Sequence, residues 1–351
     1  MKLVIGDYSS QPSRATLSQL QDFVKEPWQK EIVYFLQQLF DNSDYVEVKT
    51  SGSTGEPKLI QLPKTTMLRS AQLTNRFFGL QPGSVALLCL PASYIAGKMM
   101  LVRAIAGNYT LHAVAPSANP FATEELPALD FSAITPYQLL HSAGDLPRRN
   151  ITNIIVGGSP VTPAMEELTA EWPVALYETF GMTETASHIA LRRFNGKEAS
   201  ASFRTLEGVR LSLDDRACLV IDAPHLHNEQ LITNDLVELV DNHSFRWLGR
   251  ADRVINSGGI KIFPEQVERK LESVIDLPFF ISSKPHESLG QQVVLVLECD
   301  DLQEELKAEL LERIKPELGR YELPGQLLCI PRFVYSTGNK VLRAETLKLH
   351  N

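Results

Sequence analysis

The stretch ITNIIVGGSPVTPAMEELTAEWPVALY, residues 151–177, decides the fold class of this chain. It begins with an apolar run at 151–156 and turns at two glycines. It then shows helical spacing from 163 to 170 and returns to a second apolar run at 174–177. Short buried strands that alternate with helices are typical of a mostly parallel sheet covered by helices on both faces. This stretch therefore predicts an α/β fold.

The same alternation continues toward the N-terminus. Strands are predicted at 45–49, 85–90 and 110–115, and helices at 28–40, 65–78 and 98–106. From residue 203 to residue 247 the pattern becomes strand-rich with short turns, which indicates a small antiparallel region closing the large domain.

The pattern changes again after Gly249. Helices are predicted at 264–275 and 302–318, and strands at 279–283, 293–298 and 326–335. These elements form an α+β unit of about a hundred residues, a normal domain size. We therefore expect a large N-terminal domain over residues 1–249 and a small C-terminal domain over residues 250–351.

Composition narrows the function. The 351 residues carry a formal net charge of -8, which argues against a general binder of nucleic acid or membrane surfaces. The four cysteines, Cys89, Cys218, Cys299 and Cys329, form no CxxC pair, so we expect buried free thiols in a reducing cytosol. The N-terminus turns polar too soon for a signal peptide and no apolar run could span a bilayer, so a cytoplasmic location is expected.

The sharpest local feature is a polar loop rich in Gly, Ser and Thr. Its candidate phosphate-binding residues are Thr50, Ser51, Gly52, Ser53, Thr54, Gly55 and Lys58. Glycines let backbone N–H groups surround a polyphosphate, and a lysine supplies the counter-charge. The loop is not the P-loop of NTPases, because Pro57 precedes the lysine and no Ser or Thr follows it. The alternative interpretation is a flexible surface loop.

This loop resembles the phosphate-binding loop of the adenylate-forming superfamily of acyl- and aryl-CoA synthetases, peptide-synthetase adenylation domains and luciferases. Residues 177–184, YETFGMTE, resemble the second signature of that superfamily and follow a predicted strand. The resemblance implies that Phe180 packs on adenine, Thr183 bonds the α-phosphate and Glu184 ligates Mg²⁺. Standing alone, the motif would be a turn with a buried aromatic ring and a solvated Glu.

Three further motifs follow the order of the superfamily. Gly157-Gly158-Ser159-Pro160 resembles the loop that lies along the adenine ring and the acyl pocket. Thr233-Asn234-Asp235 stands in place of a Thr-Gly-Asp whose Asp accepts the ribose hydroxyls. Gly249-Arg250-Ala251-Asp252 resembles the end of the large domain, which implies that Arg250 touches ribose or phosphate and that Asp252 is the hinge of a mobile C-terminal domain.

The last two motifs lie in the C-terminal unit. Residues 256–265 resemble the loop that swings inward for the thioester step, with Gly258, Gly259 and Lys261 near pantetheine; the alternative is a plain hairpin turn. Residues 336–343 resemble the C-terminal Gly-Lys-x-x-Arg motif, with Asn339 inserted between glycine and lysine. The resemblance assigns the adenylation role to Lys340, which would otherwise be a solvated surface charge.

The resemblance extends from about Tyr45 to the end of the chain. It implies ATP, Mg²⁺ and coenzyme A as substrates or activator, with no tightly bound prosthetic group. Members of the superfamily usually carry a substantial N-terminal subdomain, which is nearly absent here, so the N-terminal packing and part of any homodimer surface are expected to differ.

Two stretches indicate which acid is activated. Residues 180–189 and 96–103 are similar to the o-succinylbenzoate–CoA ligases of menaquinone biosynthesis. Their substrate has two carboxylates, and a bidentate arginine best holds the one that does not react. We expect Arg103 in this role, with Lys98 second and His188 lining the acyl pocket. Alternatively, Arg103 is a surface helix charge and His188 a satisfied core histidine.

The sequence is thus interpreted as an ATP-dependent carboxylic acid–CoA ligase that acts through an acyl-AMP. Three alternatives remain open from the residues: another aryl- or acyl-CoA ligase, a stand-alone adenylation domain that loads a carrier protein, and a catalytically silent nucleotide-binding regulator.

Overall fold

The computed structural model describes residues 1–49, 59–123, 125–226, 230–335 and 341–349. Its centre is a thirteen-stranded sheet, of which one half is parallel. The parallel strands, in spatial order, are β9 (Ala175–Gly181), β8 (Ile151–Val156), β7 (Leu129–Ile134), β5 (Val85–Leu88), β6 (Thr110–Ala113) and β1 (Lys2–Ile5). β2 (Tyr8–Ser10) closes this edge in antiparallel pairing.

The other half of the sheet is antiparallel. Its strands, from the free edge to β9, are β12 (Arg210–Leu213), β13 (Cys218–Asp222), β14 (Gln230–Asp241), β15 (Ser244–Arg250), β11 (Phe203–Thr205) and β10 (His188–Arg193). The expected antiparallel region is therefore confirmed, and it continues the parallel sheet through the pairing of β9 with β10.

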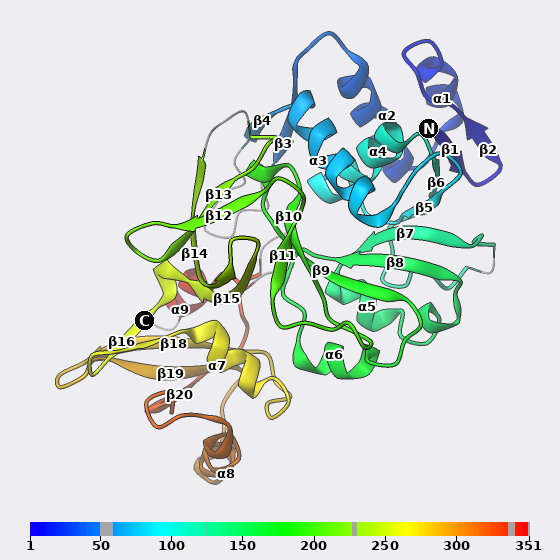
Figure 1. Cartoon of the computed structure of the whole chain (residues 1–351). Coiled ribbons are helices and arrows are strands. Elements are labelled where there is room, and N and C mark those ends of the chain that lie inside the picture. Colours follow the sequence, from blue (N-terminus) through cyan, green and yellow to red (C-terminus); the bar gives the residue numbers. More distant parts are fainter. Residues whose placement is uncertain (50–58, 124, 227–229, 336–340, 350–351) are drawn as a thin grey trace.

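Helices cover both faces of the parallel half (Figure 1). They are α1 (Leu17–Phe23), α2 (Pro27–Phe40), α3 (Lys64–Phe78), α4 (Ile95–Gly107), α5 (Pro136–His141) and α6 (Pro163–Thr169). On β5, Ala86 and Leu88 belong to the core that α3 and α4 share, whereas Leu87 belongs to the core of α5 and α6. This alternation is the period of two that a strand imposes on its side chains.

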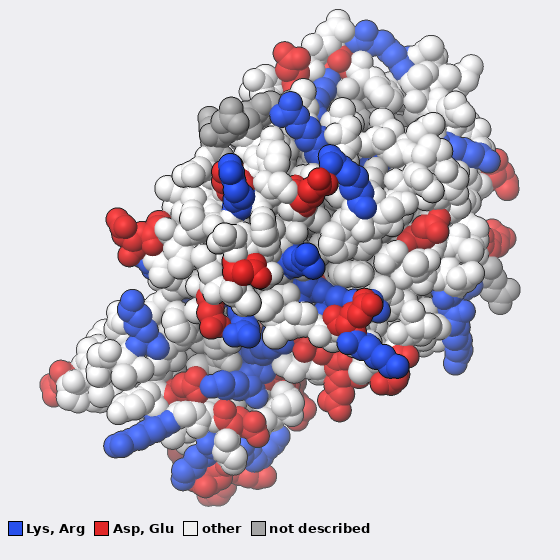
Figure 2. Space-filling model, viewed as in Figure 1, with Lys and Arg blue, Asp and Glu red and all other residues white. Residues whose placement is uncertain are grey.

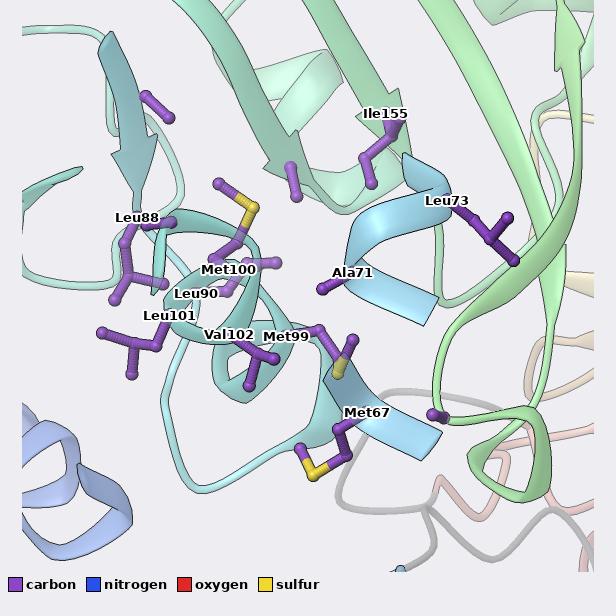
Figure 3. Packing of buried hydrophobic residues seen from close by; sticks show 14 of the residues in the cluster. Met67, Ala71, Leu73, Leu88, Leu90, Met99, Met100, Leu101, Val102 and Ile155 are labelled. Carbon is purple, nitrogen blue, oxygen red and sulfur yellow. The ribbon is translucent and has the colours of Figure 1, made fainter. Parts of the chain in front are cut away.

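The contact between α3 and α4 is tightly packed. Figure 3 shows Met67 and Ala71 of α3 beside Met99 of α4, and all three are fully or almost fully buried. At the start of α4, a β-carbon on Gly97 would lie 2.6 Å from the carbonyl carbon of Pro91, so only glycine permits this approach to the turn after β5. This packing fixes where the side chains of α4 point.

The C-terminal residues form a second sheet with its own core, drawn in yellow to red in Figure 1. Its strands are β16 (Ile255–Ser257), β17 (Ile260–Ile262), β18 (Phe279–His286), β19 (Gly290–Glu298) and β20 (Gln326–Ile330), and its helices are α7 (Pro264–Leu271), α8 (Glu304–Ile314) and α9 (Arg343–Lys348). All its strand pairs are antiparallel except β19 with β20. The mixed α/β class is confirmed.

Several bounds differ from the sequence expectation for identifiable reasons. β20 ends at Ile330, because Pro331 has no N–H to continue the ladder, and α8 ends at Ile314 in a short 3₁₀ turn that contains Pro316. β1 and β7 were not expected at all. β1 pairs in parallel with β6, so the first residues of the chain extend the central sheet.

Two shorter features complete the chain. β3 (Tyr45–Lys49) and β4 (Leu59–Pro63) form an antiparallel pair. Short 3₁₀ helices occur at Leu146–Arg148, Thr183–Thr185, Ala251–Arg253 and Lys315–Glu317. Among the residues whose structure is described, no helix is both long and apolar enough to cross a membrane.

Candidate active site

The carboxyl ends of β8 and β9 bring two of the sequence motifs to one edge of the sheet. Because these strands are adjacent and parallel, the loops that follow them lie side by side. The first loop, Gly157-Gly158-Ser159-Pro160, is exposed from Gly158 onward, and the Gly157 N–H donates to the Ile134 carbonyl at 3.0 Å. This edge is where open α/β sheets bind their ligands.

The second loop follows β9 and turns sharply. The half-buried Phe180 ring packs edge-on against Phe245 and Phe203, with centroid distances of 4.9 and 5.7 Å. A β-carbon on Gly181 would collide with the Ser187 carbonyl oxygen and lie 2.5 Å from the His188 α-carbon, so the turn requires glycine. The turn places the half-buried Thr183 beside Glu184 at the sheet edge.

Glu184 lies exposed at this edge of the sheet. Its side chain is exposed, and no hydrogen bond or ion pair joins it to another residue within the described ranges. Within those ranges no group of three His, Cys, Asp or Glu side chains could hold a metal by itself. A cation there would share one carboxylate with substrate oxygens, which suits Mg²⁺.

Asp235, Arg250 and Asp252 lie together. Asp235 on β14 is directly opposite Arg250 on β15, and its Oδ1 accepts from the Trp247 indole N–H at 3.0 Å. Arg250 Nη1 lies 3.9 Å from Asp235 Oδ2, and Arg250 Nε donates to Asp252 Oδ1 at 3.2 Å. Burial raises the pKa of Asp235, against the opposing effects of Trp247 and Arg250. The three predicted side chains therefore form one polar group.

A buried ion network, which the sequence analysis did not assign, supports the first loop. Glu178 Oε1 accepts from the Val161 N–H at 2.9 Å, and its Oε2 accepts from Arg192 Nε and Nη2 at 2.9 and 2.6 Å. Arg192 Nη2 also donates to Glu166 at 2.8 Å. Burial disfavours the Arg192 charge, but the two carboxylates raise its pKa. The sequence did contain a signal for this ion pair, because Glu178 and Arg192 are opposite charges within two consecutive, otherwise mostly apolar strands.

The network continues into the C-terminal sheet. Glu166 accepts from Arg269 of α7 at 2.6 Å, and Gln266 donates to the carbonyls of Trp247 and Leu248 at 3.0 and 3.1 Å. Figure 2 shows basic and acidic side chains intermixed along the boundary between the upper and lower parts of the molecule. Charged and polar contacts therefore hold the two units in this orientation.

The Gly258-Gly259 turn is an exposed hairpin turn between β16 and β17. Both glycines have positive φ angles, 58° and 83°, which a side chain would strain. Gly258, Gly259 and Lys261 are exposed, and among described residues no hydrogen bond or ion pair joins this hairpin to the large sheet. In this orientation the structure does not bring the predicted thioester loop to the other motifs.

Two predicted groups lie outside the described residues. They are the phosphate loop, Thr50, Ser51, Gly52, Ser53, Thr54, Gly55 and Lys58, and the C-terminal lysine, Lys340. Their flanks are described: Lys49 pairs with Leu59 in the β3–β4 ladder, and Tyr335 bridges Val341.

Arg103 is a buried cation without a carboxylate partner among the described residues. Its side chain is 2% exposed, so the surface-charge alternative is wrong. Within the described part of the chain, Nη2 donates to the Ser187 hydroxyl, Nη1 has a hydrogen bond to the Met100 sulfur at 3.6 Å, and the buried Nε has no hydrogen-bond partner. Burial lowers the pKa of Arg103 to about 10. The guanidinium lies beside Ser187 in the loop that follows β9.

Lys98 and His188 differ from Arg103. Lys98 Nζ donates to the Ala92 carbonyl at 2.8 Å and lies 5.0 Å from the Phe35 ring centroid, so it faces α2 and the structure does not bring it to Arg103. Burial lowers its pKa to about 8. Both ring nitrogens of the buried His188 have hydrogen-bond partners, as in a satisfied core histidine. The structure also adds Ser187 and Thr74 to this region.

Comparison with known proteins agrees with this arrangement. Residues 48–216 match the family of AMP-binding enzymes. The 2-succinylbenzoate–CoA ligase of Staphylococcus epidermidis is 24% identical over 331 residues, covering 84% of this chain and 67% of that relative. The probable 2-succinylbenzoate–CoA ligase of Mycobacterium tuberculosis is 27% identical over 285 residues, covering 74% and 72%.

Solved structures extend the match to almost the whole chain. An AMP-forming acyl-CoA synthetase/AMP-acid ligase II-like protein from Dyadobacter fermentans is 33% identical, with a TM-score of 0.63 and coverage of 97% of this chain and 99% of that one. The o-succinylbenzoate–CoA synthetase of Bacillus subtilis, solved with its acyl-adenylate, shares the fold at 21% identity and a TM-score of 0.70, covering 85% and 68%. The chain therefore belongs to the AMP-binding enzyme family and is an AMP-forming acid–CoA ligase.

Proposed function

We propose that the acid is 2-succinylbenzoate and that Arg103 holds the carboxylate that does not react. The observation that carries the proposal is the Arg103 guanidinium, which is buried and lacks a carboxylate partner throughout the described residues. Burying an uncompensated charge is costly, so a substrate carboxylate entering here would offset that cost. The names of the curated relatives support the same acid.

In the first half-reaction, the reacting carboxylate attacks the α-phosphate of ATP and pyrophosphate leaves. We assign Gly158, Ser159, Pro160 and Phe180 to the adenine, Asp235 and Arg250 to the ribose, Thr183 to the α-phosphate, and Thr50–Lys58 to the leaving phosphates. Glu184 would hold Mg²⁺, which supplies charge neutralisation on the phosphates. The protein contributes positioning and electrostatic stabilisation of the developing charge.

In the second half-reaction, the thiol of coenzyme A attacks the acyl carbonyl and AMP leaves. We propose domains at 1–249 and 250–351 that rotate about Asp252 between the two steps. Lys340 would serve adenylation, and the Gly258-Gly259 turn with Lys261 would serve thiolation. The exposed position of that turn in the present orientation supports a rotation before the thiol step.

The same proposal places the reaction in menaquinone biosynthesis and in the cytoplasm. Four free cysteines support a reducing compartment. The small-molecule partners in this proposal are the acid, ATP and coenzyme A, and a homodimer is compatible with it.

The substrate assignment is tested by comparing 2-succinylbenzoate with 4-oxo-4-phenylbutanoate, which lacks only the ring carboxylate. We expect Arg103→Met to lower kcat/KM for 2-succinylbenzoate by about 10²-fold or more, as loss of a charged hydrogen-bonded pair does, and to leave the monocarboxylate nearly unchanged. Lys98→Met is the matched control, because it removes a buried cation from the opposite side of α4. Equal losses with both acids in Arg103→Met would refute the assignment.

The separate roles of Lys340 in adenylation and of the Gly258-Gly259 turn in thiolation are tested by measuring the two half-reactions separately. Lys340→Ala is expected to lose pyrophosphate release yet still turn over supplied acyl-AMP with coenzyme A. Equal loss of both half-reactions would refute the proposed roles. Replacing coenzyme A by a phosphopantetheinylated carrier protein distinguishes the ligase from a carrier-loading enzyme.

A further inference from the structure

We propose that Ser187, His188 and Thr74 form a directional hydrogen-bond relay that orients the Arg103 guanidinium, and that His188 acts in it as a neutral positioning residue. The proposal rests on the proposed function, because it concerns the arginine that would hold the second carboxylate. It changes the role of His188 from a residue that lines the acyl pocket to one that acts through Arg103.

The relay joins three elements that are distant in sequence. Arg103 of α4 donates to the Ser187 hydroxyl, which lies 3.3 Å from His188 Nδ1. His188, the first residue of β10, places its Nε2 3.2 Å from the Thr74 hydroxyl on α3. The Thr74 hydroxyl then donates to the Ser70 carbonyl at 3.3 Å. Arg103, His188 and Thr74 are each at most 4% exposed.

The donors and acceptors at the two ends determine the direction. A guanidinium can only donate, so the Ser187 oxygen accepts from Arg103 and its own proton is free to bond His188 Nδ1. Nδ1 must then be unprotonated. At the other end, a carbonyl can only accept, so the Thr74 proton points to Ser70 and the Thr74 oxygen accepts from His188 Nε2. The neutral Nε2–H tautomer is the state in which the Ser187 and Thr74 hydroxyl protons both have an acceptor in this chain of hydrogen bonds.

The surrounding charges favour the same state. The ionisable groups that face His188 are Arg103 from α4 and His225 from the segment after β13, and neither is acidic. His225 Nε2 lies 3.1 Å from the Thr185 carbonyl, so it too carries its proton on Nε2. Burial, followed by the charge of Arg103 and the effect of His225, lowers the pKa of His188 well below its ordinary value. A proton on Nδ1 would also leave the Ser187 hydroxyl proton without this acceptor.

The consequence concerns binding of the acid. Because Ser187 holds Nη2, the guanidinium is fixed at one corner, while among the residues that the structure describes Nε has no hydrogen-bond partner and Nη1 bonds the Met100 sulfur. An arginine that is already oriented loses less conformational entropy when it binds a carboxylate. The relay should therefore lower KM for a dicarboxylic acid and have little effect on one that lacks the second carboxylate.

The first test is the tautomer, measured without substrate by nitrogen-15 NMR of the histidine-labelled full chain, with His188→Gln used to identify the resonance. We expect an unprotonated Nδ1 and a protonated Nε2 from about pH 5 to pH 8, the range in which a free histidine would titrate. Thr74→Val removes the acceptor of Nε2 and should shift the signal, while Thr74→Ser should not. A protonated Nδ1 or an imidazolium in the wild type would overturn the relay.

The second test is kinetic and uses two amide variants. Asn at position 188 can keep an acceptor near Nδ1, whereas Gln reaches only the Nε2 position. We expect His188→Gln to raise KM for 2-succinylbenzoate by about tenfold, equivalent to about 1.4 kcal/mol, with KM for 4-oxo-4-phenylbutanoate unchanged, and His188→Asn to restore most of the difference. Equal effects of the two variants would overturn the relay.

The two proposals fail separately. If Arg103→Met leaves the use of 2-succinylbenzoate unchanged while the tautomer is as expected, the proposed role of Arg103 in holding the second carboxylate is wrong and the hydrogen-bond relay stands as a structural feature. If Arg103→Met has its effect but the His188 tautomer is the opposite one, the relay is wrong and the substrate assignment stands.

Discussion

Replacing Arg192 by methionine should be among the most destabilising single changes in the large sheet. The Arg192 side chain is 4% exposed and that of its partner Glu178 is 9% exposed. Methionine keeps much of the side-chain length and apolar volume but removes both hydrogen bonds to Glu178 Oε2. The Glu178 carboxylate would then be buried with only the Val161 N–H as a partner.

The magnitude follows from this unpaired charge. Removing one partner of a buried ion pair costs about 3–5 kcal/mol of unfolding free energy. Glu178→Gln should cost less, about 1–3 kcal/mol, because Arg192 keeps Glu166 and the amide oxygen can still accept from Val161. In the double variant no charge of the buried pair remains, so its cost should fall below the sum of the two single costs.

The assay is urea denaturation followed by tryptophan fluorescence and circular dichroism. Arg246→Met is a matched control. Arg246 of β15 pairs with Glu238 of β14 at 3.0 Å, but both of these side chains are at least half exposed. An exposed pair contributes about 0–1 kcal/mol, so the control should unfold nearly like the wild type. The KM for ATP should rise in Arg192→Met but not in the Arg246→Met control. Arg192 holds Glu178, which accepts from the Val161 N–H, and Val161 adjoins the loop proposed to hold adenine.

Two results would refute this reasoning. One is a loss of less than about 1 kcal/mol in Arg192→Met, which would mean that solvent reaches the Glu178 carboxylate. The other is additivity in the double variant, which would mean that the two side chains are not coupled.

Three further predictions follow from other contacts. Gly181→Ala should abolish acyl-AMP formation and lower the melting temperature, because its β-carbon would meet the Ser187 backbone; wild-type activity would contradict this. Burial raises the pKa of Glu272 from 4.5 to about 7, so the folded protein retains a proton that the unfolded chain releases, and stability should fall as pH rises from about 4.5 to 7. Glu272→Gln should flatten that part of a pH-stability profile, and an unchanged slope would exclude the group. Arg269→Ala removes the partly exposed ion pair with Glu166, so the free energy of unfolding should change by less than about 1 kcal/mol. Small-angle scattering should nevertheless report a wider range of orientations of the C-terminal unit relative to the large sheet. An unchanged scattering profile would show that other contacts hold the two units.

Local pattern was sufficient for most of the central fold. The strand at 151–156, the helix from Pro163 and the strand before Gly181 were predictable, because buried strands and amphipathic helices show their periodicity within a few residues. β1 was not predictable in this way. Its four residues join the sheet only by pairing with β6, which lies more than a hundred residues later.

The same distinction applies to the candidate site. The loops after β8 and β9 could be placed from sequence because each immediately follows a strand, and adjacent parallel strands end at one edge. The surroundings of Arg103 could not be predicted from the sequence in this way. Its position on a helix was compatible with a surface charge, and only the packing of α4 against α3 and the central sheet buries it beside Ser187.

The sequence by itself determined the family, because the motifs that identify it are short and each is complete within a few neighbouring residues. The tertiary structure alone decided that Glu178 pairs with Arg192, that Lys98 faces away from Arg103, and that His188 lies between Ser187 and Thr74. Such contacts join residues up to 114 positions apart, and burial and hydrogen bonding at that separation depend on the packing of whole elements rather than on local pattern.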